Sequence, residues 1–531
     1  MKLAHKRTGW LAGLGFGAFI ASLAITTALH AEAAKPNVVV ILADDLGYGD
    51  LRCYNPDRGR ISTPHLDRLA AQGLRFTDAH SSSGVCSPSR YTLLTGRYHW
   101  RTRLQSGIVG VWGKPLIAPD RLTIASLAQQ QGYRTACIGK WHLGWDWPIA
   151  DDDKPHFHEL APRGIRPLNA KGEKKTASDQ SPVQATDANR AAWRMVFSQP
   201  IPGGPTTRGF DLYFGTDVPN WPPYCFLENN RTIGIPTELL PPRLLNGNLA
   251  SLQGPALADW TLEPILPALR DRACRFIEQQ AAAKQPFLLY MPLTTPHTPL
   301  AVNEPFRGQS GLDNAAADLI IETDAAVGRV LEALDQSGVA DQTLVVFTSD
   351  NGFAPYVGAK QLEQRGHYPS GPLRDYKGSV YEGGHREPFV VRWPPVVKAG
   401  TVCGQLVHHA DLLATLADLW DVDLPDDAGE DSFSLLPLLK GEDRAVREYS
   451  VSCASSGVPS LRQGSWKLIL NDPLELYDLA SDLSERRNTA AEHPERVSAM
   501  QKQLEQLIVR GRSTPGKPQK NDVRVKRYAA K

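Results

Sequence analysis

The stretch NVVVILADDLG, Asn37–Gly47, decides the fold of this chain. The apolar run from Asn37 to Ala43 is rich in β-branched residues and predicts a strand that is buried on both faces of a sheet. Two carboxylates, Asp44 and Asp45, follow this run at once. Open parallel sheets bind ligands beyond the carboxyl ends of their strands. The stretch therefore predicts the centre of an α/β sheet and one side of a ligand site.

The same pattern recurs further along the chain. Apolar strands are expected at Arg134–Gly139, Pro286–Met291, Thr343–Thr348 and Phe389–Trp393, and helices at Leu122–Gln131, Ala315–Gln336 and Pro494 to about Arg510. Strands that alternate with helices predict an α/β fold with a large, mostly parallel central sheet and helices on both faces. Polar residues follow four of the strands, so we expect these four strand ends to meet in one crevice.

Changes in composition divide the chain into segments. Residues 34–424 are expected to form the main domain, within which the polar residues 151–209 form an insertion or long loops. Short strands and a final helix predict a smaller C-terminal α+β domain at residues 425–510. Residues 511–531 are rich in basic side chains and are expected to be a disordered tail, with a basic binding arm as the alternative.

The overall composition is that of a soluble globular protein. Of the 531 residues, 42% are apolar and 22% are charged, and the formal net charge is +1. A length well above about 250–300 residues favours more than one domain. A net charge this close to zero supplies no basic field for nucleic acid, so no nucleic-acid partner is expected.

The N-terminus has the three parts of a secretory signal peptide. A basic start precedes an apolar run at Leu11–Leu29, and small residues near Ala33 supply a cleavage site. We therefore expect residues 1–33 to be removed on export to the periplasm or the cell exterior. No stable membrane span is expected after cleavage, whereas the uncleaved run would anchor the chain in a membrane.

Four oxygen-bearing side chains stand at the ends of two predicted strands. Asp44 and Asp45 follow one strand, and Asp350 and Asn351 follow another. Hard cations such as Ca²⁺ or Mg²⁺ take ligands of this kind, whereas zinc prefers histidine and cysteine. A helix cap or a turn explains Asp44-Asp45 alone equally well, but not the two pairs together. The set predicts a site for a hard divalent cation.

Basic and titratable side chains accompany these acidic ones. Lys140 and His142 follow a strand, His297 lies in a Pro-His-Thr-Pro loop, Lys377 precedes a Glu-Gly-Gly segment, and Arg90 lies in the turn-rich stretch SSGVCSPSR. Each one alone is better explained as an exposed side chain. Together with a cation they predict a positively charged pocket with two imidazoles, which suits binding and transfer of a tetrahedral oxyanion.

Cys86 stands out among the seven cysteines. It lies in a run of small, turn-forming residues, four positions before a permanent cation, and the odd count in an exported chain singles out one cysteine. The pairing of the other six is left open, and free thiols are an equal alternative.

These motifs together resemble the type I sulfatases of the alkaline-phosphatase-like superfamily, over roughly residues 36–510. The motifs that carry the resemblance are Cys86-Ser87-Pro88-Ser89-Arg90, Leu94-Thr95-Gly96-Arg97, Asp44-Asp45-Leu46-Gly47, Gly139-Lys140-Trp141-His142, Gly209-Phe210-Asp211, Ser349-Asp350-Asn351-Gly352, Lys377 with its Glu-Gly-Gly, and Leu476-Tyr477-Asp478-Leu479. The implied activity is hydrolysis of a sulfate monoester of a carbohydrate or an aryl alcohol. Export and the long variable loops favour a carbohydrate sulfate.

The resemblance also implies roles for individual residues. A formylglycine-generating enzyme would oxidise Cys86 to formylglycine, which acts as nucleophile and metal ligand while Arg90 holds it in place. Asp44, Asp45, Asp350 and Asn351 would complete a Ca²⁺ site, for which Mg²⁺ is the less favoured ion. Lys140, His297 and Lys377 would bind the substrate, His297 on the side of the leaving group, and His142 would act as base. The implied catalytic set consists of six residues: Cys86, Arg90, Lys140, His142, His297 and Lys377.

The chain departs from the family pattern after the Gly-Phe segment. Some sulfatases contact the substrate there through a serine, whereas this chain reads Gly215-Thr216-Asp217-Val218-Pro219-Asn220. The contact is either lost or taken by Asn220. Two other functions are weighed against sulfate ester hydrolysis. One is a phosphoester or phosphonate monoester hydrolase of the same superfamily, and the other is an exported binding protein without activity.

Overall fold

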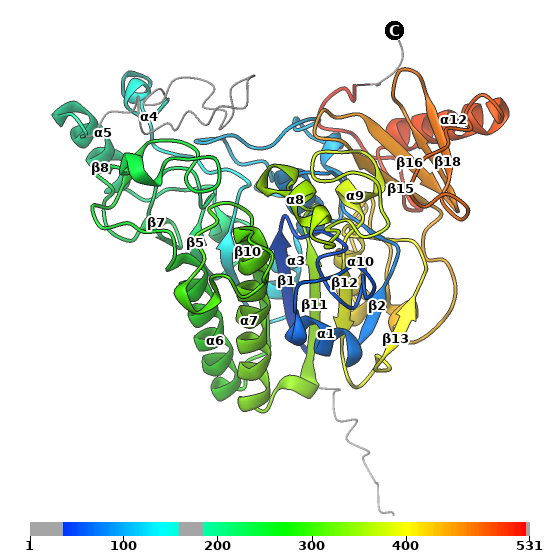
Figure 1. The fold of residues 1–531 in the computed structure, drawn as a ribbon, viewed down its shortest axis with the longest axis horizontal. Coiled ribbons are helices and arrows are strands. Elements are labelled where there is room, and N and C mark those ends of the chain that lie inside the picture. The colour runs from blue at the N-terminus through cyan, green and yellow to red at the C-terminus, as the bar shows by residue number, and fades with distance from the viewer. Residues whose placement is uncertain (1–34, 159–183, 527–531) are drawn as a thin grey trace, which may run out of the picture. The chain divides into compact units, whose positions relative to one another are not determined.

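The strand predicted after Asn37 is β1, Asn37–Asp44, and it lies in the middle of the large sheet (Figure 1). The computed structural model describes residues 35–158 and 184–526, which belong to one unit. The predicted signal peptide and the middle of the predicted insertion lie outside the described residues. On either side of β1 run β10, Phe287–Pro296, and β11, Thr343–Ser349, both parallel to it.

The sheet contains ten described strands, in the order β13-β2-β12-β11-β1-β10-β4-β5-β6-β7. The remaining strands are β4 (Arg134–Lys140), β5 (Leu212–Thr216), β12 (Phe389–Arg392), β2 (Leu74–Phe76), β13 (Thr401–Cys403), β6 (Leu227–Glu228) and β7 (Arg231–Thr232). The five strands from β11 to β5 are all parallel, as predicted, but β12 and β6 join their neighbours antiparallel. The predicted strand after Phe389 therefore exists and runs against the central ones, which makes the sheet mixed.

Alternate residues of β1 face two separate cores. Val39 and Ile41 pack among α1 (Pro64–Ala71), α6 (Ile265–Ala283) and α7 (Ala315–Gln336), whereas Val38 and Val40 pack on the opposite face. That second face is covered by α2 (Cys86–Thr95), α3 (Ile124–Gln130) and α10 (Asp411–Leu419). Each side chain of this kind contributes roughly 1.5–3 kcal/mol on burial, which explains why an uninterrupted apolar run reads as a doubly covered strand.

A second, antiparallel sheet follows near the C-terminus. Its strands are β15 (Tyr449–Cys453), β16 (Pro459–Gln463), β17 (Trp466–Ile469) and β18 (Glu475–Asp478). Helix α12, Pro494–Arg510, lies beside this sheet (Figure 1). Its buried residues Met500 and Leu504 pack against Leu461 and Leu468 of the sheet. The sheet and helix match the predicted α+β character of this part of the chain.

Shorter elements complete the described chain. The remaining strand pairs are β3 (Ala79–His80) with β14 (Val407–His408) and β8 (Glu238–Leu239) with β9 (Pro255–Ala256). The remaining helices are α4 (Pro155–His158), α5 (Asp187–Phe197), α8 (Ala359–Gln364), α9 (Glu382–His385) and α11 (Leu436–Leu439). All seven cysteines are free thiols. No helix within residues 35–158 and 184–526 combines the length and apolarity needed to cross a membrane.

Residues 511–526 differ from the predicted disordered tail. The carboxylate of Asp522 accepts hydrogen bonds from Arg97 at 3.0 and 3.2 Å, and its backbone N–H donates to the carbonyl of Arg101 at 2.8 Å. The side-chain oxygen of Asn521 accepts from Arg101 at 3.0 Å. Both guanidinium groups are fully buried and require acceptors, which this segment supplies. A basic composition alone could not reveal that requirement.

Removal of residues 511–531 is therefore expected to lower the free energy of unfolding by about 2 kcal/mol or more, because Arg97 and Arg101 lose buried acceptors. Thermal unfolding would compare this variant with a chain that ends at Lys526 and keeps the contacts. Equal melting temperatures for the two chains would contradict this interpretation.

Candidate active site

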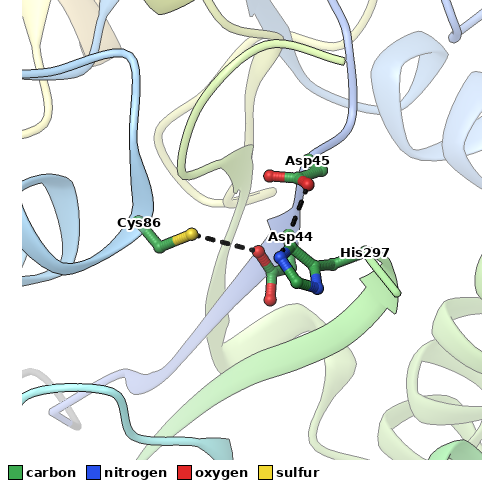
Figure 2. Close-up of side chains that lie close together, drawn as sticks. All are labelled: Asp44, Asp45, Cys86 and His297. Carbon is green, nitrogen blue, oxygen red and sulfur yellow. Dashed lines mark hydrogen bonds and ion pairs between the residues drawn. The ribbon is translucent and has the colours of Figure 1, made fainter. Parts of the chain in front are cut away.

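The carboxyl ends of the parallel strands bring the predicted site residues together. Asp44 ends β1, Lys140 ends β4, His297 follows β10 and Asp350 follows β11, and all four side chains are buried. Asp44, Asp45, Cys86 and His297 each offer one ligand atom, and these atoms lie within 4.8 Å of one another (Figure 2). Lys140 also bonds to Asp44, and Asp350 accepts from the backbone of Asp45, so the four strand ends meet in one buried cluster, as predicted.

Cys86 is the first residue of α2, and its thiol points into this cluster (Figure 2). The Sγ atom lies 3.7 Å from Oδ1 of Asp44 and 3.7 Å from Nζ of Lys377. Burial raises the pKa of the Cys86 thiol to about 12, although Lys140 and Lys377 act in the opposite direction. The unmodified side chain is thus a protonated thiol at neutral pH, not a thiolate.

Arg90 lies one helical turn after Cys86 and on the same side of α2. Its Nε and Nη2 atoms donate to Oδ2 of Asp350 at 3.0 and 2.8 Å, and Nη1 donates to the carbonyl of Lys140 at 2.9 Å. Nη2 also lies 3.4 Å from Oδ2 of Asp44. One fully buried guanidinium therefore joins the ends of three strands to the helix that carries Cys86.

Lysines neutralise the aspartates beside Cys86. Nζ of Lys140 lies 2.6 Å from Oδ2 of Asp44, and Nζ of Lys377 lies 2.7 Å from Oδ2 of Asp45. Burial would raise the pKa of Asp44, but Lys140 and the neighbouring cations outweigh burial and hold that pKa well below its usual value. Burial and the charge of Asp44 raise the pKa of Asp350 to about 7.

The acidic side chains fit a hard divalent cation. Asn351 donates through Nδ2 to Oδ1 of Asp45 at 2.7 Å, while its own Oδ1 is buried and has no hydrogen-bond partner among the described residues. Asp350 accepts through Oδ1 from the backbone N–H of Asp45 at 3.2 Å, and a carboxylate oxygen keeps a second lone pair after accepting one hydrogen bond. Carboxylates with an amide oxygen are the ligands that such cations prefer.

Both predicted histidines lie beside this cluster. The Nε2 atom of His142 lies 3.0 Å from the carbonyl of Val109, and its Nδ1 is buried with no partner among the described residues. The Nδ1 atom of His297 lies 2.6 Å from the carbonyl of Thr298, and its Nε2 lies 3.7 Å from Oδ2 of Asp45. A carbonyl only accepts, so the free nitrogens, Nδ1 of His142 and Nε2 of His297, carry the lone pairs.

The pKa values of both histidines lie below the usual value of an imidazole. Burial, followed by the charge of Lys377, lowers the pKa of His297 to about 4. Burial, followed by the charge of Lys140, lowers the pKa of His142 well below its usual value. Both imidazoles are therefore neutral at neutral pH in this arrangement. A neutral imidazole can act as a base at once, whereas an imidazole that acts as an acid must first take up a proton.

Asn220 lies close to, but not within, the charged cluster. Its Nδ2 donates to Oγ of Ser251 at 2.6 Å and to Oγ1 of Thr298 at 3.3 Å, next to His297. Its Oδ1 is buried without a hydrogen-bond partner among the described residues. A substrate contact by Asn220 stays a prediction.

Sequence reasoning missed several residues that contact the histidines. Asp217 accepts from the backbone N–H of His142 at 3.1 Å, and the ring of Trp221 meets the His142 ring edge-on at 5.4 Å. Val109 and Thr298 contribute carbonyls. Only Asp217 could have been identified from the sequence, because it is a polar residue at the carboxyl end of a strand, as are Asp44 and Asp350. Carbonyl contacts leave no trace in side-chain chemistry.

Comparisons with known proteins identify the family of the chain. The sequence model of the family described as Sulfatase matches residues 36–180 and 207–422, and the model described as N-sulphoglucosamine sulphohydrolase, C-terminal, matches residues 375–513. An N-acetylgalactosamine-6-O-sulfatase of Bacteroides thetaiotaomicron is 33% identical over 90% of this chain and 94% of its own length. Human arylsulfatase A is 32% identical over 90% of this chain and 88% of its own.

A solved structure from work on glycosaminoglycan metabolism by Bacteroides thetaiotaomicron superposes with a TM-score of 0.72 and 30% identity, covering 90% of this chain and 99% of that one. The two family models together cover the residues of both the large sheet and the C-terminal sheet. The chain therefore belongs to the sulfatase family and is a hydrolase of sulfate esters.

Proposed function

We propose that this sulfatase cleaves a carbohydrate sulfate with a formylglycine made from Cys86 as nucleophile and with Ca²⁺ bound at Asp44, Asp45, Asp350 and Asn351. The observation that carries the proposal is the position of Cys86, at the start of α2, within one cluster of carboxylates and cations. Export, and with it a periplasmic or extracellular site of action, stays a prediction that rests on residues 1–33.

A modified residue 86 explains the chemistry better than a thiol does. The buried thiol is protonated at neutral pH, and the thiolate is the nucleophilic form of cysteine. A hydrated aldehyde instead supplies one hydroxyl to attack sulfur and a second to expel sulfate afterwards. The modifying enzyme would act before folding, because Cys86 is 2% exposed in the folded chain.

The three basic side chains of the cluster, Arg90, Lys140 and Lys377, would lie beside the sulfate group of the substrate. Arg90 joins the strand ends to the helix that carries residue 86, while Lys140 bonds to Asp44 and Lys377 bonds to Asp45. When the aspartates bind a cation, the two ammonium groups become available for sulfate oxygens. The bound cation would supply charge stabilisation for the developing negative charge.

The substrate class rests on the relatives. One of them is named an N-acetylgalactosamine-6-O-sulfatase and matches nearly the full length of both chains. Asn220 offers a buried amide oxygen near His297 as an acceptor for a hydroxyl of the sugar. Phosphate or phosphonate monoester hydrolysis is the competing activity. Rates on sulfated and phosphorylated forms of one alcohol distinguish the two, and a faster phosphate reaction would reverse the assignment.

The Cys86→Ala variant is expected to fold and to lose activity by about 10⁴-fold or more, because it lacks the nucleophile. Expression without a formylglycine-generating system should leave an intact thiol and little turnover. Mass spectrometry of the peptide that contains residue 86 tells thiol from aldehyde. Full activity of a preparation that carries only the thiol would disprove the formylglycine proposal.

The Asp350→Ala variant is expected to lose tight calcium binding together with activity, since Asp350 lies between Asp45 and Arg90 at the proposed ligand set. Titration calorimetry with Ca²⁺ measures binding without any turnover. Asp318→Ala, which removes a buried carboxylate on α7, serves as the control. Retention of one tightly bound calcium per chain by Asp350→Ala would show that the ligand assignment is wrong.

The two histidines are expected to fail in different ways. His297 would take up a proton from solvent and pass it to the leaving oxygen. His297→Ala should therefore slow sugar sulfates far more than activated phenyl sulfates, because a phenolate departs without protonation. His142→Ala should slow release of sulfate and let a sulfated enzyme accumulate, which rapid quench and mass spectrometry detect. The division of roles fails if His297→Ala slows both substrates equally and His142→Ala yields no adduct.

A further inference from the structure

His142 is held in an unusual backbone conformation. Its φ of 55° lies in the left-handed region, which costs a residue with a side chain about 1–2 kcal/mol. Such conformations persist where the surroundings hold them, and they gather at functional sites. The chain therefore has to supply contacts that keep His142 in place.

The last residue of β5 and the residue after it supply those contacts. The N–H of Trp141 donates to the carbonyl of Thr216 at 3.2 Å, and the N–H of His142 donates to Oδ1 of Asp217 at 3.1 Å. The same Oδ1 accepts from the indole N–H of Trp145 at 3.2 Å. One carboxylate oxygen thus fixes both ends of the turn from His142 to Trp145.

The Asp217 carboxylate acts on the backbone and not on the imidazole. Among the hydrogen bonds of the described residues, none joins Asp217 to the ring of His142. The ring instead contacts the carbonyl of Val109 and the edge of Trp221, both uncharged. A carboxylate bonded to the ring would favour the imidazolium form, whereas this arrangement orients the ring and leaves it neutral.

The environment of Asp217 suits an acceptor in a fixed position. The residue is 8% exposed, and burial raises its pKa to about 6 against the opposing effect of its two hydrogen-bond donors. A short, buried side chain has little freedom to move, so its oxygen is a firm anchor for a strained backbone.

We propose that Asp217 is a positioning residue for the reaction. It holds His142 in the left-handed conformation, so that Nε2 reaches Val109 and Nδ1, the nitrogen with the lone pair, is presented to the site. The proposal rests on the role of His142 as base proposed above. Asp217 touches none of the reacting groups and acts through His142 alone.

Two substitutions of Asp217 distinguish the effect of its acceptor oxygen from the effect of its charge. Asp217→Ala removes the acceptor and is expected to lower kcat by about 10- to 100-fold, with KM for a small aryl sulfate within about threefold. Sulfated enzyme should accumulate, as in His142→Ala. Asp217→Asn keeps an acceptor oxygen and is expected to restore kcat to within about threefold of the native enzyme. Asp217→Leu, which has the same branched shape but no acceptor, replaces the Ala variant if that one does not fold.

Asp211 provides a matched control at the other end of β5. Its carboxylate accepts from the backbone N–H of Thr135 on β4 at 2.8 Å, far along the strand from the site. Asp211→Ala should lower the melting temperature without producing a sulfated adduct. An adduct in this variant as well would show that general loosening of β4 and β5 is the cause, and would overturn the role of Asp217.

The double variant and a crystal structure complete the test. Asp217→Ala added to His142→Ala should cause no further loss of kcat, because both act through one group. Multiplied losses would overturn the proposal, as would a crystal structure of Asp217→Ala in which His142 keeps its left-handed φ and its bond to Val109. Reorientation of His142 with unchanged kcat would support the positioning and overturn the proposed base role of His142.

Discussion

The architecture of the site depends on the buried guanidinium of Arg90. It bonds to Asp350 beyond β11 and to the carbonyl of Lys140 at the end of β4, and it lies within ion-pair distance of Asp44 at the end of β1. Parallel strands alone leave three carboxyl ends facing one crevice. Arg90 fixes their relative positions and attaches α2, which presents Cys86 at its first residue.

Charge balance explains how so many ionisable groups can be buried together. Arg90, Lys140 and Lys377 match Asp44, Asp45 and Asp350 in number when all are ionised, and each cation has a carboxylate within ion-pair distance. Removing one partner from such a set leaves an uncompensated buried charge, which costs about 3–5 kcal/mol. A bound cation would shift the balance to positive, which favours entry of an anionic ester.

The two histidines complement this charged cluster because they are neutral. Each one donates to a backbone carbonyl, so each keeps a lone pair on its other ring nitrogen. The loop after β5 contacts His142 through Asp217 and Trp221, and its Asn220 donates to Thr298, the residue next to His297. The segment that departs from the family pattern is thus the one that surrounds the proposed acid and base.

The sequence by itself determined the central strands, the long helix Ala315–Gln336 and the candidate residues, because apolar periodicity and side-chain chemistry are local properties. Asp44, Lys140, His297 and Asp350 could be assigned to one crevice since parallel strands share a carboxyl edge. Tertiary structure alone decided the neutral state of His142, the order of residues 511–526 and the contact of Asp217. Each of these depends on burial or on a partner distant in the chain. The desolvation of a charged group and the distance from a side chain to a backbone carbonyl are determined only once the chain has folded.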